Sequence, residues 1–349
     1  MARTKSRRPP RTGPGIHMVK ASEYLFPDPT EREAFINALL TGVGREQSLI
    51  ILRDHSALRV FPRLGPTSWQ PDFVMRLDAD FRPGKHPLYE KGHFYSLDFS
   101  SVFSSSVMTA IQQPVRRVLD LCSAPGGKAI FAWRLFQPEV LACNETIRKR
   151  CGMLIDNLTR CDITGARVWS ADPSVYARRW PESFDLVLVD APCSGQSLMA
   201  KGEPAPGAFT PAMIDMNVGR QRRIAAHAVA CLRPGGHMFY STCTFSAKEN
   251  EKIIAWIMET FPAMKPVVVD KLAAFQSSKA EFPCYRLFPH QGLGAGAFAC
   301  LLRKEGEPPA HYPPIDDLTG LWWTGKPPVD RTARADMPPP PRNRPKKPD

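Results

Sequence analysis

From Pro114 onward, short apolar runs alternate with amphipathic segments of helical length. This alternation predicts β–α units laid on a largely parallel sheet. The predicted strands are residues 118–122, 140–143, 167–170, 184–190 and 237–241. The predicted helices are residues 127–135, 147–160, 211–232 and one that begins with Ser246 and Glu249 in capping-box spacing. Open α/β sheets bind ligands at the carboxyl ends of their strands, so we expect the chemistry-bearing residues there.

The chain before Pro114 has a mixed pattern. A helix is predicted near residues 29–40 and strands near 48–52 and 57–61, with loops rich in Pro and Gly. We therefore expect residues 21–114 to form a small α/β N-terminal region and residues 115–304 to form the main domain.

The two ends of the chain differ from the body in composition. Residues 1–20 and 305–349 are rich in Pro and basic side chains, and such composition does not offset the entropy of ordering, so we expect both to be mostly disordered. Trp322 and Trp323 interrupt the second tail and would fasten part of it to the body. Of the net charge of +12, residues 1–20 carry +6 and residues 326–349 carry +4, which leaves +2 for the rest. Most of the long-range attraction for a polyanion should therefore come from the ends.

Cysteine usage and hydropathy limit the class of protein. The nine cysteines include no CxxC pair, which argues against zinc-ribbon spacing, and their odd number argues against a disulfide framework. We expect no metal, and a reducing cytoplasmic environment. The first twenty residues have no apolar core, and no apolar run approaches the roughly 18 residues of a membrane span. We therefore expect a soluble cytoplasmic protein without a membrane partner.

A glycine-rich turn follows the first predicted strand, where Asp120 to Lys128 reads DLCSAPGGK. Glycines there let the backbone approach a ligand closely, although a plain helix-entry turn accounts equally well for Gly126 and Gly127 alone. The turn is neither GxGxxG nor a P-loop. Lys128 is the only basic residue at the turn, so we expect a ligand without a polyphosphate.

Three acids follow the next three strands, namely Glu145, Asp172 and Asp190. A single surface acid is usually a solvated charge, but three at successive carboxyl ends indicate a site. Glu145 is placed to accept both hydroxyls of a ribose, and Asp172 is placed for an adenine amino group. Together with the turn, they predict a nucleoside ligand.

Two cysteines, Cys193 and Cys243, each lie just beyond an apolar run, in the segments DAPCSG (190–195) and YSTCT (240–244). A lone cysteine is usually a small buried hydrophobe, and four fit that default, namely Cys122, Cys143, Cys231 and Cys300. Cys193 and Cys243 differ because both are expected at the carboxyl edge of the sheet.

Together, the segments 120–128, 190–195 and 240–244 resemble the signatures of the RsmB/NSUN-type RNA cytosine-5 methyltransferases. The similarity extends over roughly residues 90–303. Leu97, Ser123 and Ala129 stand where the family more often has Gln, Ala and Thr. The resemblance implies a Rossmann-like class I methyltransferase that uses S-adenosylmethionine. The cofactor-binding residues it implies are Cys122, Ser123, Ala124, Pro125, Gly126, Gly127, Lys128, Glu145, Arg150, Asp172 and Asp190.

The resemblance also implies roles for three catalytic residues. Cys243 would be the nucleophile that adds to carbon 6 of cytosine, Asp190 would lie near the base, and Cys193 would assist release of the product. Enzymes that methylate carbon 5 of cytosine in DNA carry their nucleophile in a Pro-Cys motif, so Cys193 alone leaves the assignment open and Thr242 with Cys243 favours the RNA type. An Asp-Pro-Pro-Tyr motif, typical of methylation at an exocyclic amino group, is absent.

Several interpretations stay open at this point. The substrate implied first is ribosomal RNA and second transfer RNA, gripped in part by residues 21–114. A catalytically silent RNA-binding or ribosome-assembly factor with the same fold is the competing class. Residues 196–209 are either a substrate-contacting flap or a solvated loop. Arg220, Arg222 and Arg223 are either phosphate contacts or a solvated helix face.

The charge partition predicts that removing both basic ends weakens RNA binding and flattens its dependence on salt. For every phosphate that the shortened protein no longer neutralises, the slope of log K against log salt should decrease in magnitude by about one unit. Filter binding at a series of salt concentrations measures the slope. An unchanged slope would contradict the prediction.

Overall fold

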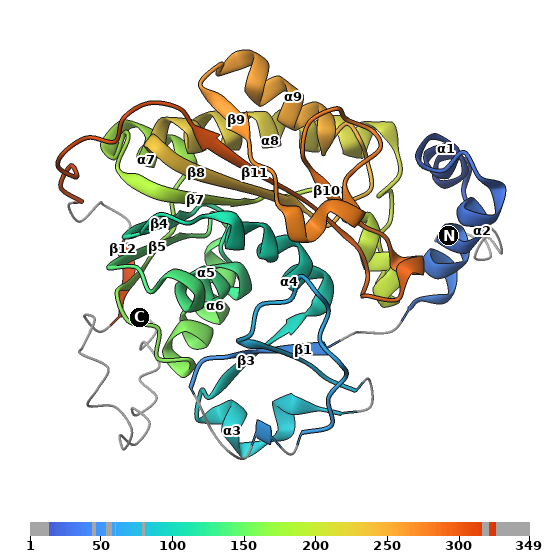
Figure 1. The fold of residues 1–349 in the computed structure, drawn as a ribbon, viewed down its shortest axis with the longest axis horizontal. Coiled ribbons are helices and arrows are strands. Elements are labelled where there is room, and N and C mark those ends of the chain that lie inside the picture. Colours follow the sequence, from blue (N-terminus) through green and yellow to red (C-terminus); the bar gives the residue numbers. More distant parts are fainter. Residues whose placement is uncertain are drawn as a thin grey trace, which may run out of the picture.

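One large sheet organises the fold, as the computed structural model shows (Figure 1). The structure describes residues 14–43, 47–53, 58–59, 61–78, 81–315 and 321–325. Within these ranges the strand order is β10-β11-β8-β7-β4-β5-β6-β12, and β9 pairs with β11. The strands are β4 (Arg117–Asp120), β5 (Val140–Asn144), β6 (Ala166–Trp169), β7 (Phe184–Asp190), β8 (Leu232–Thr242), β9 (Met264–Pro266), β10 (Tyr285–Leu287), β11 (Ala297–Lys304) and β12 (Leu321–Thr324).

The centre of the sheet is parallel, as the alternating pattern predicts. Strands β6, β5, β4, β7 and β8 run in one direction, and each of the five predicted strands is confirmed. Strands β11 and β12 lie antiparallel at the two sides. The chain order reverses between β4 and β7, so these two neighbours lead to opposite halves of the sheet. A reversal of this kind leaves a crevice at the carboxyl edge, where ligands bind.

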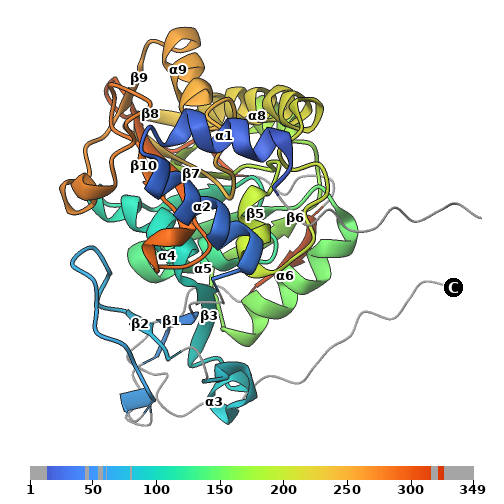
Figure 2. The same cartoon turned by 90° about the vertical axis from the view of Figure 1, so that its right-hand side faces the viewer.

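Helices cover both faces of the sheet, as Figures 1 and 2 show. One face carries α7 (Pro173–Arg179), α8 (Pro211–Cys231) and α9 (Glu251–Thr260), and the other carries α4 (Phe99–Ser106), α5 (Gly127–Phe136) and α6 (Arg148–Arg160). The predicted helices correspond to α5, α6, α8 and α9. No helix within the described ranges has both the length and the hydrophobicity needed to cross a membrane.

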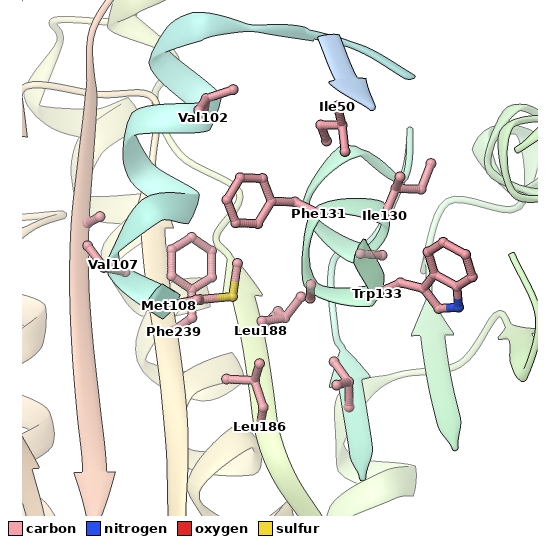
Figure 3. Packing of buried hydrophobic residues seen from close by; sticks show 14 of the residues in the cluster. Ile50, Val102, Val107, Met108, Ile130, Phe131, Trp133, Leu186, Leu188 and Phe239 are labelled. Atoms are coloured by element: carbon pink, nitrogen blue, oxygen red, sulfur yellow. The ribbon is translucent and has the colours of Figure 1, made fainter. Parts of the chain in front are cut away.

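The core on the α4 and α5 side is a continuous cluster of apolar side chains (Figure 3). Its buried members come from the helices, from the sheet and from the N-terminal strand β1 (Gln47–Ile51). Figure 3 labels Ile50, Val102, Val107, Met108, Ile130, Phe131, Trp133, Leu186, Leu188 and Phe239. Each such side chain contributes about 1.5–3 kcal/mol when fully buried, so this cluster fixes α4 and α5 against the sheet.

The N-terminal region does not form the single small unit predicted for residues 21–114. Helix α4 lies within that range, yet it packs on β11 and belongs to the main core. Strands β1, β2 (Val74–Arg76) and β3 (Phe94–Asp98) form a separate antiparallel sheet, and the short α3 (Pro87–Glu90) lies between β2 and β3 along the chain. The boundary predicted at residue 114 therefore does not match the packing. Helix α4 precedes that boundary, yet its apolar side chains pack on the main sheet.

Helices α1 (Ile16–Leu25) and α2 (Pro29–Thr41) lie away from β1–β3, beside the short helix η6 (Pro289–Gln291) (Figure 2). Phe35 of α2 is fully buried there, with its ring centroid 5.0 Å from that of Phe245 and 5.9 Å from that of Phe288. An aromatic cluster thus attaches these helices directly to the main domain.

The predicted strand at residues 57–61 is wrong for the part that the structure describes. Leu58 and Arg59 form a single 3-10 turn, and Phe61 N donates a hydrogen bond back to Leu58 O. Leu58 and Phe61 are both buried in a small cluster with Phe94. The turn places both apolar side chains on the same side of the backbone. In a strand, two residues three positions apart would point to opposite faces. Residues 57 and 60 lie outside the described ranges.

The predicted capping box at Ser246 and Glu249 is also wrong. Helix α9 begins at Glu251, with Asn250 as its N-cap residue. The Glu249 side chain bonds to Ser194 instead of to its own helix end. A buried set of donors from other elements thus competes successfully for this carboxylate.

Parts of both predicted tails are ordered. Helix α1 begins at Ile16, inside the predicted tail 1–20, and its Met18 is buried. A deletion that tests the charge of this end should therefore stop at residue 13, just before the described ranges begin. In the second tail Tyr312 donates a hydrogen bond of 2.7 Å to Asp185, and Trp323 in β12 packs on the core, as the tryptophan pair predicts. Residues 316–320 and 326–349 of the predicted tail lie outside the described ranges.

Gly92 and Gly152 give opposite predictions for replacement by alanine. Gly92 has φ +69° and an added Cβ would lie 1.9 Å from Arg160 O, so Gly92→Ala should cost at least about 1–3 kcal/mol. Gly152 lies inside α6 with open space around it, so Gly152→Ala should stabilise by about 0.5–1 kcal/mol. Urea unfolding of both variants measures the two free energies. Equal stability of wild type and Gly92→Ala would contradict the close approach of Gly92 to the end of α6.

Candidate active site

The carboxyl ends of β7 and β8 bring Cys193 and Cys243 together. These parallel strands are neighbours, and their register pairs Asp190 with Ser241. Cys193 lies three residues beyond Asp190, and Cys243 lies two residues beyond Ser241. The two Sγ atoms are 3.3 Å apart. Both thiols are partly exposed and neither is in a disulfide. The sequence thus correctly predicts that both lie at one sheet edge.

The two thiols have opposite electrostatic character. The hydrogen bond from Cys193 lowers the pKa of Cys243 and outweighs burial and the charge of Asp190, which raise it; the charges of Lys128 and Lys201 lower it further. The same hydrogen bond, together with burial, raises the pKa of Cys193 well above its usual value. Cys243 is therefore the thiol that ionises. Cys193 stays protonated and donates a hydrogen bond to the Cys243 sulfur.

Asp190 forms an ion pair beside the thiols. Its Oδ2 lies 2.7 Å from Lys128 Nζ, and its Oδ1 accepts a hydrogen bond of 2.8 Å from the Ser241 hydroxyl. Burial alone would lower the pKa of Lys128, but the contact with Asp190 outweighs it and the pKa is raised. Lys128, which the resemblance implies as a cofactor residue, thus reaches from the turn across to the end of β7.

The predicted turn joins β4 to α5 in a tightly fixed conformation. Gly126 adopts φ +108°, which only glycine adopts easily, and a Cβ on Gly127 would lie 2.7 Å from the Leu97 side chain. Ser123 N donates to Asn144 O at 2.8 Å, and Arg150 Nη2 donates to Ala124 O at 2.5 Å. The turn therefore has little freedom and is hydrogen-bonded to the end of β5 and to α6.

The three predicted acids lie in different surroundings. Glu145 is almost fully buried, accepts a hydrogen bond of 2.8 Å from Ile147 N, and pairs with Arg150 at 3.0 Å. Asp172 caps α7 through Ser174 N at 3.0 Å and pairs with Arg223 of α8 at 2.6 Å. Burial would raise the pKa of Asp172, but these hydrogen bonds and the charge of Arg223 outweigh it and lower the pKa. Glu145 and Arg150 adjoin the turn, whereas Asp172 begins the next helix.

Two buried polar groups next to the turn lack hydrogen bonds of normal geometry within the described residues, namely Asp120 Oδ2 and the Ser123 hydroxyl beside it. Burial, together with the charge of Asp190, raises the pKa of Asp120 to about 7. The exposed side chain of Ile147 lies two residues beyond Glu145. An apolar surface, a carboxylate and unused polar groups at one edge suit a ligand with an amino group, a ribose and a flat base.

Sequence reasoning missed a buried set of polar residues behind the thiols. Glu249 and Gln221 are both buried and bond to the loop that carries Cys193. Asn250 is buried as well and bonds to Thr242 and Thr244 on either side of Cys243. The sequence does contain a signal for this set, because three polar residues at 249–251 directly precede the apolar face of α9. The same residues also fit the spacing of a capping box, so the signal is ambiguous.

The open interpretations of two segments are now resolved in part. Residues 196–201 form the short helix η4, where Ala200 O accepts a hydrogen bond from Val43 N and Lys201 pairs with Asp98 at 3.3 Å. This part of the segment is therefore anchored on both sides. On α8, Arg223 pairs with Asp172 and Arg222 lies over the Trp256 ring, so two of the three arginines have protein partners.

No set of three or more His, Cys, Asp or Glu side chains within the described residues is arranged to hold a metal ion. The site thus consists of a thiol pair, an ion pair and a glycine turn at the carboxyl edge of a sheet.

The strand order, the antiparallel β11 beside β8 and the glycine turn after β4 define a Rossmann-like class I methyltransferase fold. Residues 108–303 match the family described as 16S rRNA methyltransferase RsmB/F. The chain therefore belongs to the RsmB/F methyltransferase family, as the three motifs predict.

Two relatives are similar to this chain over most of its length. The ribosomal RNA small subunit methyltransferase F of Erwinia tasmaniensis is 30% identical over 89% of this chain and 66% of its own length. That of Serratia proteamaculans is 31% identical over 71% of this chain and 53% of its own length. The chain thus spans about half to two thirds of these relatives.

Among solved structures, NSun6 from Pyrococcus horikoshii superposes with a TM-score of 0.67 at 17% identity, covering 84% of this chain and 99% of that one. A methyltransferase homolog protein from the same organism gives a TM-score of 0.65 at 19% identity, covering 83% of this chain and 99% of that one. These likenesses establish the fold.

Asp120 predicts a pH dependence of stability. Its pKa is raised to about 7 in the folded protein, against about 3.9 unfolded, so the folded state binds the proton more tightly between these values. The contribution of Asp120 to the unfolding free energy should therefore fall as the pH rises from about 4 to about 7, and Asp120→Asn should remove that fall. Urea unfolding between pH 4.5 and 8 measures it, with the exposed Asp215→Asn as the control for loss of one charge. Parallel curves for wild type and Asp120→Asn would contradict the prediction.

Proposed function

We propose that this protein methylates carbon 5 of a cytidine in structured RNA, with S-adenosylmethionine as donor and ribosomal RNA as substrate. The observation that carries the proposal is the pair of sulfur atoms 3.3 Å apart, beside the Asp190–Lys128 ion pair, at the carboxyl edge of a class I methyltransferase sheet. Family membership supports the same chemistry.

The residues around the glycine turn fit the proposed donor. Glu145 and Asp172 would accept from the ribose and the adenine, with Ile147 against the base, and the backbone of residues 122–127 would line the methionine end. Asp120 Oδ2 and the Ser123 hydroxyl offer polar atoms that make no hydrogen bond of normal geometry within the described residues. When bound, S-adenosylmethionine supplies an electrophilic methyl group on a sulfonium centre.

Cys243 is the nucleophile in this proposal. Carbon 5 of cytosine is a poor nucleophile, and addition of the Cys243 thiolate to carbon 6 breaks the C5=C6 π bond as the S–C6 bond forms, which makes carbon 5 reactive. The lowered pKa of Cys243 supports this role. Lys128 would donate a hydrogen bond to the ring edge and stabilise the negative charge that develops on it, while the Asp190 carboxylate would hold Lys128 in place and accept from the amino group of the base.

Cys193 acts in the second half of the reaction. Once Cys243 is bonded to carbon 6, the hydrogen bond between the sulfurs loses its thiolate acceptor, and Cys193 releases its proton to water. After carbon 5 has bonded the methyl group, whose bond to the sulfonium sulfur of the donor breaks to leave a neutral thioether, Cys193 takes the proton from carbon 5. The C5=C6 bond then re-forms and the S–C6 bond breaks, which returns Cys243 as a thiolate. Without this step the enzyme and the RNA stay covalently joined.

The names of the relatives favour ribosomal RNA of the small subunit over transfer RNA. The basic ends of the chain would add non-specific attraction for RNA, and a ribosomal substrate suits a cytoplasmic protein. A catalytically silent RNA-binding factor is the competing proposal, but such a factor needs neither the close thiols nor the ion pair beside them.

The two thiols should give different phenotypes when replaced. With tritiated S-adenosylmethionine and RNA from cells lacking the modification, Cys243→Ala should abolish methyl incorporation and form no adduct. Cys193→Ala should still form the bond to carbon 6 and accumulate a protein–RNA complex on a denaturing gel. Bisulfite sequencing of the product locates the methylated cytidine.

Three outcomes would count against the proposal. If Cys243→Ala accumulates the covalent protein–RNA complex and Cys193→Ala does not, the roles of the two cysteines are reversed. Absence of incorporation into every RNA class by the wild type would favour the silent binder. Methyl incorporation into transfer RNA alone would show that transfer RNA, and not ribosomal RNA, is the substrate.

A further inference from the structure

We propose that Glu249 is a positioning residue that holds both thiols in register for the two halves of the reaction. The inference rests on the proposed function and deepens it. Glu249 is fully buried, and no cation pairs with it within the described part of the chain. Its carboxylate is instead satisfied by neutral donors from three separate elements.

The donors include the residues that directly follow each cysteine. Ser194 follows Cys193 and donates to Glu249 from its backbone N at 2.8 Å and its hydroxyl at 2.6 Å. Thr244 follows Cys243 and donates from its hydroxyl at 3.4 Å. One carboxylate thus bonds to both loops, each time one residue away from a thiol.

Further bonds close this arrangement. The Ser194 and Thr244 hydroxyls are 2.7 Å apart, so the single hydrogen of Thr244 is shared between Ser194 and Glu249, and the two loops also contact each other. Gln221 of α8 donates to Glu249 at 3.1 Å and to Pro192 O, just before Cys193, at 3.0 Å. Glu249 itself is fixed by the Tyr240 hydroxyl of β8, which donates to its backbone oxygen at 2.7 Å. Rotation of either loop would break bonds to the same group.

The charge of Glu249 suits this task better than an amide would. Burial raises the pKa of Glu249, and its hydrogen-bond donors oppose that rise. A glutamine carries hydrogens at one end. With its oxygen towards Ser194 N and Gln221, it would force the Ser194 and Thr244 hydroxyls to turn and accept; with the amide reversed, it would put hydrogens against the Ser194 N and Gln221 donors. Glu249→Gln therefore changes the fit of both loops while keeping the size of the side chain.

Glu251 provides a matched control. It is also buried and lies two residues away, but its carboxylate bonds to Arg286 and Ser277 and to neither cysteine loop. A purely structural role for the acids would make Glu249→Gln and Glu251→Gln behave alike. A positioning role for Glu249 alone makes them differ in how the thiols react.

Alkylation of Cys243 tests the inference without RNA. Iodoacetamide is added to the full-length protein over a pH series, and the peptide that contains Cys243 is quantified by mass spectrometry, with thermal unfolding as a check of folding. In Glu249→Gln the misplaced Cys193 no longer stabilises the Cys243 thiolate, so the pH midpoint of alkylation should rise. In Glu251→Gln the midpoint should stay at the wild-type value.

Turnover provides the second readout. In Glu249→Gln, kcat should fall by about 10- to 100-fold, because small misplacements of reacting groups have effects of that size, while KM for S-adenosylmethionine stays within about twofold. Both formation and breakdown of the protein–RNA adduct should slow, unlike in either cysteine variant.

Folded Glu249→Gln with a wild-type alkylation midpoint would overturn the inference. If Glu249→Gln does not fold, Ser194→Ala decides in its place, since it removes one hydroxyl bond to Glu249, and a smaller rise in midpoint is expected; no rise overturns the inference. If the wild type transfers no methyl group to any RNA, the proposed function fails, yet the alkylation series still decides the role of Glu249.

Discussion

The pairing of β7 with β8 is the constraint on which the site depends. Because these strands are parallel and in a fixed register, the two chains leave the sheet side by side, and each carries its cysteine a short step beyond the edge. A shift of one residue in either strand would turn its following side chains to the opposite face. The large apolar clusters on both faces hold that register. The reactive geometry is therefore a property of the whole sheet and not of two loops.

The polar groups behind the edge are unusual for their depth. Glu249 relies on neutral donors, whereas Glu251 lies against Arg286, and both side chains are buried. Burying a charge costs free energy unless all of its hydrogen bonds are made. Such groups therefore favour the one loop conformation in which all these hydrogen bonds form. In front of them, Lys128 and Asp190 form an ion pair that remains partly open to solvent. The site thus combines a rigid interior with an accessible face.

Much of the fold could be predicted from periodicity, because buried parallel strands are nearly continuous apolar runs. The positions of Cys193, Cys243 and Asp190 at strand ends followed from the same pattern. What could not be predicted were contacts between residues distant in sequence. Glu249 has the local spacing of a capping box, yet donors from another loop hold it. The spacing near Leu58 resembles a strand, but a small apolar cluster favours a turn. Helix α1 lies in a basic, Pro-rich stretch and is held by aromatic residues far along the chain.

The pairing of β12 with β6 has a consequence for how this protein behaves among its own copies. A parallel strand at the margin of a sheet presents a row of free amide and carbonyl groups, which invites another chain to add a strand. Here residues 321–324 lie along that margin, and Trp323 anchors them to the core. The edge of the sheet thereby passes from β6 to a four-residue strand whose register shifts, and a short, irregular edge is a poorer template for the strand of another chain.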